Sequence, residues 1–159
     1  MTADDKDGAD VRFPPPLLPL ATVLAGVLLE RWFPFGAFEL STPGRYWFGG
    51  VFIAACILVL GLWPVVLFRR SGQSELPWRP TPSILETGPY RYTRNPMYLM
   101  MVLVCLGIAI VLSNAWIVVL TPVCAWALFR FAISPEETYL ERKFGEPYRG
   151  YKRRVRRWL

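Results

Sequence analysis

Histidine is absent from this sequence of 159 residues. Its absence removes the side chain that most often serves as a general base or a metal ligand in enzymes. Cysteine is scarce as well, since Cys56, Cys105 and Cys124 are the only three and all lie within apolar stretches. Their spacing does not resemble that of a metal site. We interpret them as small buried hydrophobic residues and expect no metal centre.

Charge is also scarce, at 19% of the residues, whereas hydrophobic residues make up 53%. The apolar residues gather in four runs, at about 17–33, 46–68, 97–112 and 115–133. A helix needs about 20 apolar residues to cross a bilayer, with roughly 17 as the lower limit. The second and fourth runs meet this length and the other two are marginal. The sequence therefore predicts an all-α, polytopic membrane protein with about four transmembrane helices, rather than a soluble bundle.

The first residues differ in composition from the rest of the chain. Residues 1–10 are polar and mostly acidic, without the basic segment and cleavage site of a signal peptide. We interpret 1–13 as a disordered tail and 14–159 as a single membrane domain. No feature of the sequence specifies an oligomeric state.

Basic residues are distributed unevenly between the apolar runs. Residues 69–94 hold five arginines and the segment after 134 holds eight basic residues, whereas the turn at 113–114 holds no charge. The positive-inside rule then places the middle loop and both termini in the cytoplasm, which fits a protein of the cell inner membrane. For the basic tail at 152–157 we expect anionic lipid head groups as the partner, and no nucleic acid.

Two polar stretches flank the last two apolar runs. Residues 88–98 read GPYRYTRNPMY, and residues 136–151 read EETYLERKFGEPYRGY. The runs between them form a C-terminal helical hairpin whose arms, at 1.5 Å per residue, are each roughly 26–28 Å long. Both stretches therefore return to the same face of the membrane. Tyr98 is expected level with Glu136.

Both stretches also look like helix starts, which would be a purely structural role. Asn95 is a favoured N-cap and Pro96 a favoured first helical residue. Ser134 is expected to cap a short cytoplasmic helix over about 135–144, with Glu137 at the capping-box position. Local sequence alone leaves this structural role and a functional one open.

The combined chemistry of the two stretches favours a small ligand that is zwitterionic and cationic, with a carboxylate and an ammonium or sulfonium group. Glu136 and Glu137 lie where the chain leaves the bilayer, and a carboxylate there is costly unless it meets a cation. The helix that begins at Pro96 offers free backbone N–H groups and the positive end of its dipole to an anion.

The two stretches resemble the signatures of the isoprenylcysteine carboxyl methyltransferase and phospholipid methyltransferase superfamily of integral-membrane enzymes. The first signature has the form G-x-Y-x-x-x-R-[HN]-P-x-Y, and the second E-E-x-x-L-x-x-x-F-G-x-x-Y-x-x-Y. The matching residues are Gly88, Tyr90, Arg94, Asn95, Pro96 and Tyr98 in the first, and Glu136, Glu137, Leu140, Phe144, Gly145, Tyr148 and Tyr151 in the second. The resemblance covers about residues 78–157.

This resemblance implies S-adenosylmethionine as the cofactor and a lipid-like or prenylated small-molecule acceptor that enters from the bilayer. The cofactor-binding residues that it implies are Tyr90, Arg94, Asn95, Pro96, Tyr98, Glu136, Glu137, Tyr148 and Tyr151. Within this set, Asn95, Tyr98 and Glu137 are the expected catalytic residues.

The chemical class of the acceptor stays open. Asn95 stands where the carboxyl methyltransferases usually have His, whereas phospholipid N-methyltransferases often have Asn there. We expect a reaction like that of the isoprenylcysteine enzymes, with phospholipid N-methylation as the alternative; the acceptor atom belongs to a carboxylate, an amine or a thiol. A relative of the NADPH-dependent membrane reductases and a non-catalytic membrane module are further alternatives, which detection of bound S-adenosylmethionine would separate.

Overall fold

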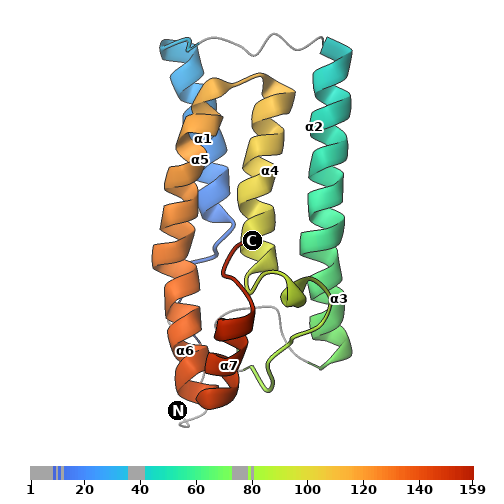
Figure 1. Cartoon of the computed structure of the whole chain (residues 1–159). Coiled ribbons are helices and arrows are strands. Elements are labelled where there is room, and N and C mark those ends of the chain that lie inside the picture. Colours follow the sequence, from blue (N-terminus) through green and yellow to red (C-terminus); the bar gives the residue numbers. More distant parts are fainter. Residues whose placement is uncertain (1–8, 10, 12, 36–41, 73–78, 80) are drawn as a thin grey trace.

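The computed structural model describes residues 9, 11, 13–35, 42–72, 79 and 81–159 (Figure 1). All regular secondary structure in these ranges is helical, as the sequence predicts. The elements are α1 (Leu17–Trp32), α2 (Thr42–Cys56), η2 (Ile57–Leu62), α3 (Trp63–Arg70), η3 (Gly88–Arg91), α4 (Pro96–Leu112), α5 (Ala115–Leu128), η4 (Phe129–Ile133), α6 (Ser134–Phe144) and α7 (Glu146–Arg154).

Four rods lie side by side along the long axis of the molecule (Figure 1). One is α1 and one is α4; the third joins α2, the π-helical η2 and α3, and the fourth joins α5, the π-helical η4 and α6. The third rod has 29 residues and the fourth has 30. At 1.5 Å per residue these two rods are about 45 Å long, which exceeds the roughly 30 Å hydrocarbon core of a bilayer.

Two rods, Thr42–Arg70 and Ala115–Phe144, are long and apolar enough to cross a membrane. Only 17% and 33% of their most apolar windows are buried inside the protein. The core helix of a soluble protein would be mostly buried, so this exposed apolar surface indicates a membrane protein. The rods α1 and α4 have 16 and 17 residues, and the predicted crossing by all four stays a prediction.

Helix α4 lies between α2 and α5, and α1 packs against α5 and α4. Two glycines allow α2 and α4 to approach closely. A Cβ atom on Gly49 would lie 2.5 Å from Val111 Cγ2, and one on Gly107 would lie 2.5 Å from Ile53 Cγ1. Small residues at such a contact bring two helix backbones together where lipid removes the hydrophobic driving force.

A polar turn joins α4 to α5 and holds α1 against them. Ser113 has a positive φ of 51°, and Asn114 follows it as the N-cap of α5. The Asn114 side chain accepts a hydrogen bond from Ile117 N at 3.0 Å and donates one to the carbonyl of Gly26 at 3.2 Å. The Asn114 side chain therefore caps α5 and links the turn between α4 and α5 to α1.

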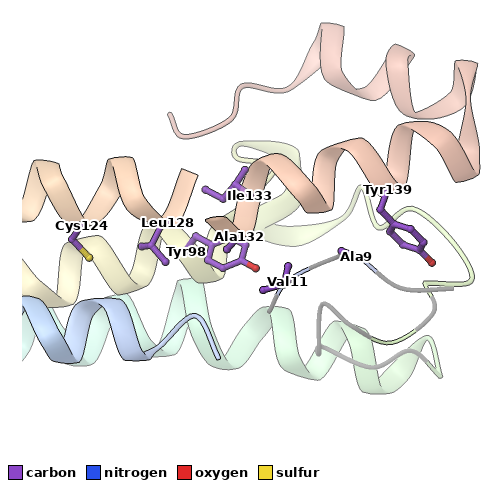
Figure 2. Close-up of a cluster of buried hydrophobic side chains, with 8 residues drawn as sticks. All are labelled: Ala9, Val11, Tyr98, Cys124, Leu128, Ala132, Ile133 and Tyr139. Atoms are coloured by element: carbon purple, nitrogen blue, oxygen red, sulfur yellow. The ribbon is translucent and has the colours of Figure 1, made fainter. Parts of the chain in front are cut away.

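A hydrophobic cluster lies toward the end of the bundle that carries the two polar stretches, residues 88–98 (the first motif) and 136–151 (the second motif) (Figure 2). Its buried members are Ala9, Val11, Tyr98, Cys124, Leu128, Ala132, Ile133 and Tyr139. The expected disordered tail falls mainly on residues 1–8, 10 and 12, which lie outside the described residues, whereas Ala9 and Val11 are buried in this cluster.

The predicted N-cap role of Ser134 is wrong, although α6 does begin at this residue. Ile133, which precedes it, is already helical and makes no side-chain cap, because η4 continues directly into α6. The capping box expected at Glu137 therefore does not form. The predicted end of this helix is confirmed: α6 stops at Phe144, and Gly145 takes a φ of 60° before α7 begins. The structure adds α7, which the sequence analysis did not predict.

Candidate functional site

A cavity at this end of the bundle collects residues from both motifs. Its empty volume is about 630 Å3, of which the enclosed part is narrow and the rest opens to solvent. All nine predicted cofactor residues line it, including the three expected to be catalytic: Tyr90, Arg94, Asn95, Pro96, Tyr98, Glu136, Glu137, Tyr148 and Tyr151. The structure thus brings every predicted site residue together, and their chemical roles stay predictions.

The remaining wall of the cavity comes from residues that the sequence analysis did not assign to the site. They are Phe68, Thr81, Ser83, Ile84, Leu85, Met97 and Leu140. Most belong to the connector between α3 and η3, which has no periodicity to place it. One hydrogen bond, from Thr81 N to Tyr139 Oη at 3.3 Å, fixes this connector against α6. A ligand in the cavity would meet polar motif residues and, from the connector, both polar and apolar side chains.

The first contact between the motifs joins Tyr98 to Glu136. The Tyr98 hydroxyl donates a hydrogen bond to Glu136 Oε2 at 2.9 Å. The described ranges hold no cation within ion-pair distance of Glu136, since their ion pairs use other carboxylates. Glu136 therefore lines the cavity without a cationic partner from the described part of the chain.

Glu137 has the opposite environment. Its side chain is 8% exposed, and its Oε1 atom lies 3.3 Å from Arg94 Nη1. The guanidinium of Arg157 donates to both of its oxygens, from Nε at 3.0 Å and from Nη2 at 2.9 Å. Two cations neutralise this carboxylate, so the adjacent glutamates differ in the charge they present to a ligand. Arg157 belongs to neither motif, and the sequence analysis placed it in the basic tail at 152–157, for which anionic lipid head groups are the expected partner.

Arg94 is buried with an unused donor. Its side chain is 8% exposed and lines the cavity, and its Nε atom has no hydrogen-bond partner within the described ranges. A buried donor without a partner costs about 1–3 kcal/mol. An anionic group in the cavity would satisfy it.

Asn95 does not use its side chain as predicted. Pro96 does begin α4, but the Asn95 side chain makes no cap hydrogen bond. Instead its Nδ2 atom donates to the carbonyl of Arg157 at 3.1 Å. Asn95 is therefore the N-cap residue by position, as predicted, but its side chain does not cap the helix, because a distant segment of the chain offers this amide a partner.

The tyrosines of the site act as neutral donors. The Tyr151 hydroxyl donates to the carbonyl of Tyr90 at 2.8 Å, which attaches α7 to the first motif. Burial raises the pKa of Tyr90, Tyr148 and Tyr151 above the ordinary value, and the nearby Glu137 carboxylate adds to the effect at Tyr148. Their hydroxyl groups therefore stay protonated at neutral pH.

The basic tail is largely paired within the chain. The pairs are Lys152 with Glu141 at 2.8 Å, Arg153 with Glu146 at 2.6 Å and Arg154 with Glu86 at 2.6 Å. Hydrogen bonds from Lys152 and then Arg149 lower the pKa of the Glu141 carboxyl below its usual range. Binding of this tail to anionic lipid stays a prediction, and its side chains would have to exchange partners to make it.

Comparison with known proteins identifies a family and two similar proteins. The family described as "Phospholipid methyltransferase" matches residues 45–147. An uncharacterized protein of Haemophilus influenzae is 46% identical over 65 residues, which are 40% of this chain and 100% of that protein. The protein-S-isoprenylcysteine O-methyltransferase of Schizosaccharomyces pombe is 32% identical over 72 residues, which are 45% of this chain and 30% of that enzyme. No solved structure matches the chain significantly.

The fold and the site define a helical membrane protein with a cavity at an end of its bundle that residues of both motifs line. The chain belongs to the phospholipid methyltransferase family, within the superfamily that also contains the isoprenylcysteine carboxyl methyltransferases. This membership supports a membrane methyltransferase.

Proposed function

We propose that this chain is an integral-membrane methyltransferase that moves the methyl group of S-adenosylmethionine to a lipophilic acceptor. The observation that carries the proposal is the convergence of the nine predicted cofactor residues on one cavity. Family membership supplies the reaction class.

The residues present fit the cofactor. S-adenosylmethionine has an ammonium and a sulfonium cation, a carboxylate and an aromatic ring. The uncompensated Glu136 suits a cation, and the free Nε of the buried Arg94 suits a carboxylate. Met97 and Leu140 offer apolar surface in the same cavity. Bound there, the cofactor supplies an electrophilic methyl group.

The residues of the chain position the reactants. Tyr98 holds the Glu136 carboxylate through its hydroxyl, and Glu137 holds the Arg94 guanidinium. Ile84 and Leu85 of the connector add apolar surface to the cavity. Aligning two reactants is a large part of catalysis for a transfer that needs no covalent intermediate on the protein.

For the acceptor we propose a carboxylate, as in the isoprenylcysteine enzymes, ahead of a phospholipid amine. A carboxylate needs no base, whereas an ammonium group must first lose a proton. Of the residues described in the cavity wall, Glu136 is the carboxylate free of cations, and it already accepts the Tyr98 hydrogen bond.

The experiment uses the full chain in vesicles made from lipids of the expression host, with S-adenosylmethionine labelled in its methyl group. We expect label to enter the lipid phase with the wild type and to be lost with Glu136→Gln. Mild alkali separates the acceptors, because a methyl ester releases labelled methanol and an N-methyl group does not. If the wild type fails to bind S-adenosylmethionine in calorimetry, the proposal is wrong.

We further propose that all four rods cross the cell inner membrane. The apolar runs and the positive-inside rule support this topology, with the middle loop and both termini in the cytoplasm. The candidate site then lies at the cytoplasmic face, where S-adenosylmethionine is available and a lipid-borne acceptor can approach laterally.

A further inference from the structure

The segment Val155–Arg157, here named the strap, leaves α7 and lies along the first motif. Val155 is extended, with φ −119° and ψ 133°. Thr93 and Arg156 then form a parallel bridge, in which Arg94 N donates to the carbonyl of Arg156 at 2.9 Å. The strap therefore adds a short backbone pairing to the loop that carries the first motif.

The carbonyl of Arg157 satisfies two side chains of that loop. It accepts hydrogen bonds from Thr93 Oγ1 at 3.0 Å and from Asn95 Nδ2 at 3.1 Å. Both donors are buried, with exposures of 1% and 8%. Without the strap these buried groups would lose their acceptor, and a buried donor without a partner is destabilising.

The guanidinium of Arg157 reaches the second motif. It binds both oxygens of Glu137 in α6 and lies with its Cζ atom 4.7 Å from the centroid of the Phe129 ring. A bidentate contact of this kind fixes both partners in one geometry. Arg157 thus contacts the first motif through its backbone and the second through its side chain.

The contact between Arg157 and Glu137 also limits how closely Arg94 binds Glu137. Arg157 takes both oxygens of Glu137, and Arg94 keeps a single, longer contact of 3.3 Å to one of them. If Arg157 were removed, Glu137 would be a buried carboxylate with Arg94 as its remaining cation. Arg94 would then be drawn fully to Glu137 and its Nε would leave the cavity.

We infer that Arg157 is a positioning residue of the candidate site, which neutralises Glu137 so that Arg94 stays available to an anionic group in the cavity. The inference rests on the proposed function for the identity of the ligand. The family match ends at residue 147, so that match assigns no role to the strap.

The first test compares Arg157→Gln with Arg156→Gln, each in the full chain in detergent. Both variants lose one positive charge from adjacent positions, but the Arg156 side chain is exposed and joins the strap pairing through its carbonyl. We expect Arg157→Gln to weaken S-adenosylmethionine binding in calorimetry about tenfold or more, because the buried Glu137 carboxylate loses the cation that binds both of its oxygens. Arg156→Gln should stay within about twofold. Equal affinities of the two variants would overturn the inference.

The second test shows whether Arg157 acts through the charge of Glu137. In the double variant Glu137→Gln with Arg157→Gln, no unpaired carboxylate remains to attract Arg94. We expect this double variant to bind S-adenosylmethionine as well as Glu137→Gln alone. A further tenfold loss on adding Arg157→Gln to Glu137→Gln would contradict a role through Glu137. The double variant also keeps the test decisive if Arg157→Gln alone does not fold.

The third test needs no ligand and separates this inference from the proposed function. Hydrogen exchange at residues 93–95, measured by mass spectrometry without ligand, reports the pairing of the Arg94 amide with the strap. We expect faster exchange there in Arg157→Gln and wild-type exchange in Arg156→Gln. If the wild type binds no S-adenosylmethionine, the proposed function fails and exchange alone decides this inference. Unchanged exchange in Arg157→Gln would overturn it.

Discussion

The hydroxyl of Tyr98 lies 2.9 Å from Oε2 of Glu136 and joins two motifs that are 38 residues apart in the sequence. The ring of the same tyrosine belongs to the hydrophobic cluster beside the site (Figure 2). Tyr98 therefore anchors its ring in the packed core while its hydroxyl orients the carboxylate that carries no cationic partner from the described part of the chain. The position of Glu136 is in this way tied to the packing of α4 against α5 and α6.

Replacing Tyr98 with Phe removes this hydrogen bond and keeps the packed ring. A hydrogen bond to a charged group contributes about 1.5–3 kcal/mol, so we expect S-adenosylmethionine affinity to fall about tenfold or more. Calorimetry in detergent measures the effect. Tyr92→Phe is the matched control, because the Tyr92 side chain is 74% exposed and loses the same hydroxyl. Identical affinities of the two variants would remove Tyr98 from the site.

Replacing each of the two adjacent glutamates with Gln should affect a different property, stability for Glu137 and ligand binding for Glu136. Glu137→Gln leaves Arg94 and Arg157 without their shared carboxylate, and breaking a buried ion pair typically costs about 3–5 kcal/mol. Glu136→Gln removes a charge that has no cationic partner in the described ranges, so the free energy of unfolding should hardly fall. Its cost should appear in ligand binding instead, at about tenfold or more. Thermal unfolding and calorimetry on both variants check this split, and equal destabilisation by both would contradict it.

Asn95 should tolerate substitution only where a donor to Arg157 remains. Asn95→Asp replaces the Nδ2 donor with an oxygen that faces the carbonyl of Arg157, so we expect a loss of about 1–3 kcal/mol of stability. From sequence alone, Asp should cap α4 as well as Asn and keep stability. Asn95→His retains a ring N–H donor and should be the milder change. A lower unfolding temperature for Asn95→His than for Asn95→Asp would show that this hydrogen bond contributes little to stability.

Much of the site could be predicted because its residues belong to two compact motifs. Tyr98 and Glu136 were expected at one level from the equal length of two helical arms, and the hydrogen bond between them confirms it. Composition also located the four apolar rods, since long runs with little charge have few other structures available.

The parts that could not be predicted depend on contacts between distant segments. Asn95 has the local sequence of an N-cap, but its amide binds Arg157, which lies 62 residues away. Ser134 and Pro135 have the sequence of a helix start, yet the preceding π-helical turn continues straight through them. Local preferences of this kind contribute about 1 kcal/mol, and a buried tertiary hydrogen bond is large enough to override them.

The proposed topology predicts which positions can be labelled from each side of the membrane. The native cysteines are buried, so single cysteines can be introduced at the exposed positions Ser71, Leu112 and Arg142 without removing them. A maleimide that cannot cross the membrane should label Ser71→Cys and Arg142→Cys in inside-out vesicles and Leu112→Cys in right-side-out vesicles. Labelling of Ser71→Cys and Arg142→Cys from opposite sides would disprove the arrangement with four crossings.

Stability should depend on pH through the buried tyrosines of α7, Tyr148 and Tyr151. Burial raises the pKa of Tyr148 and Tyr151 above the ordinary value of 10.0, which means that folding favours their neutral form. A group whose pKa is higher in the folded state contributes stability that is complete below its unfolded pKa and is lost as pH rises toward its folded pKa.

We therefore expect the unfolding temperature in detergent to fall as pH rises above about 10, where an unfolded tyrosine ionises. Lysines titrate in the same range, so the comparison that isolates the tyrosines is with the double variant Tyr148→Phe and Tyr151→Phe. This variant should start lower at pH 8, because the hydrogen bond from Tyr151 to Tyr90 is lost, and should fall less between pH 8 and 11. An equal fall in both proteins would mean that these hydroxyl groups ionise as freely in the folded protein as in the unfolded chain.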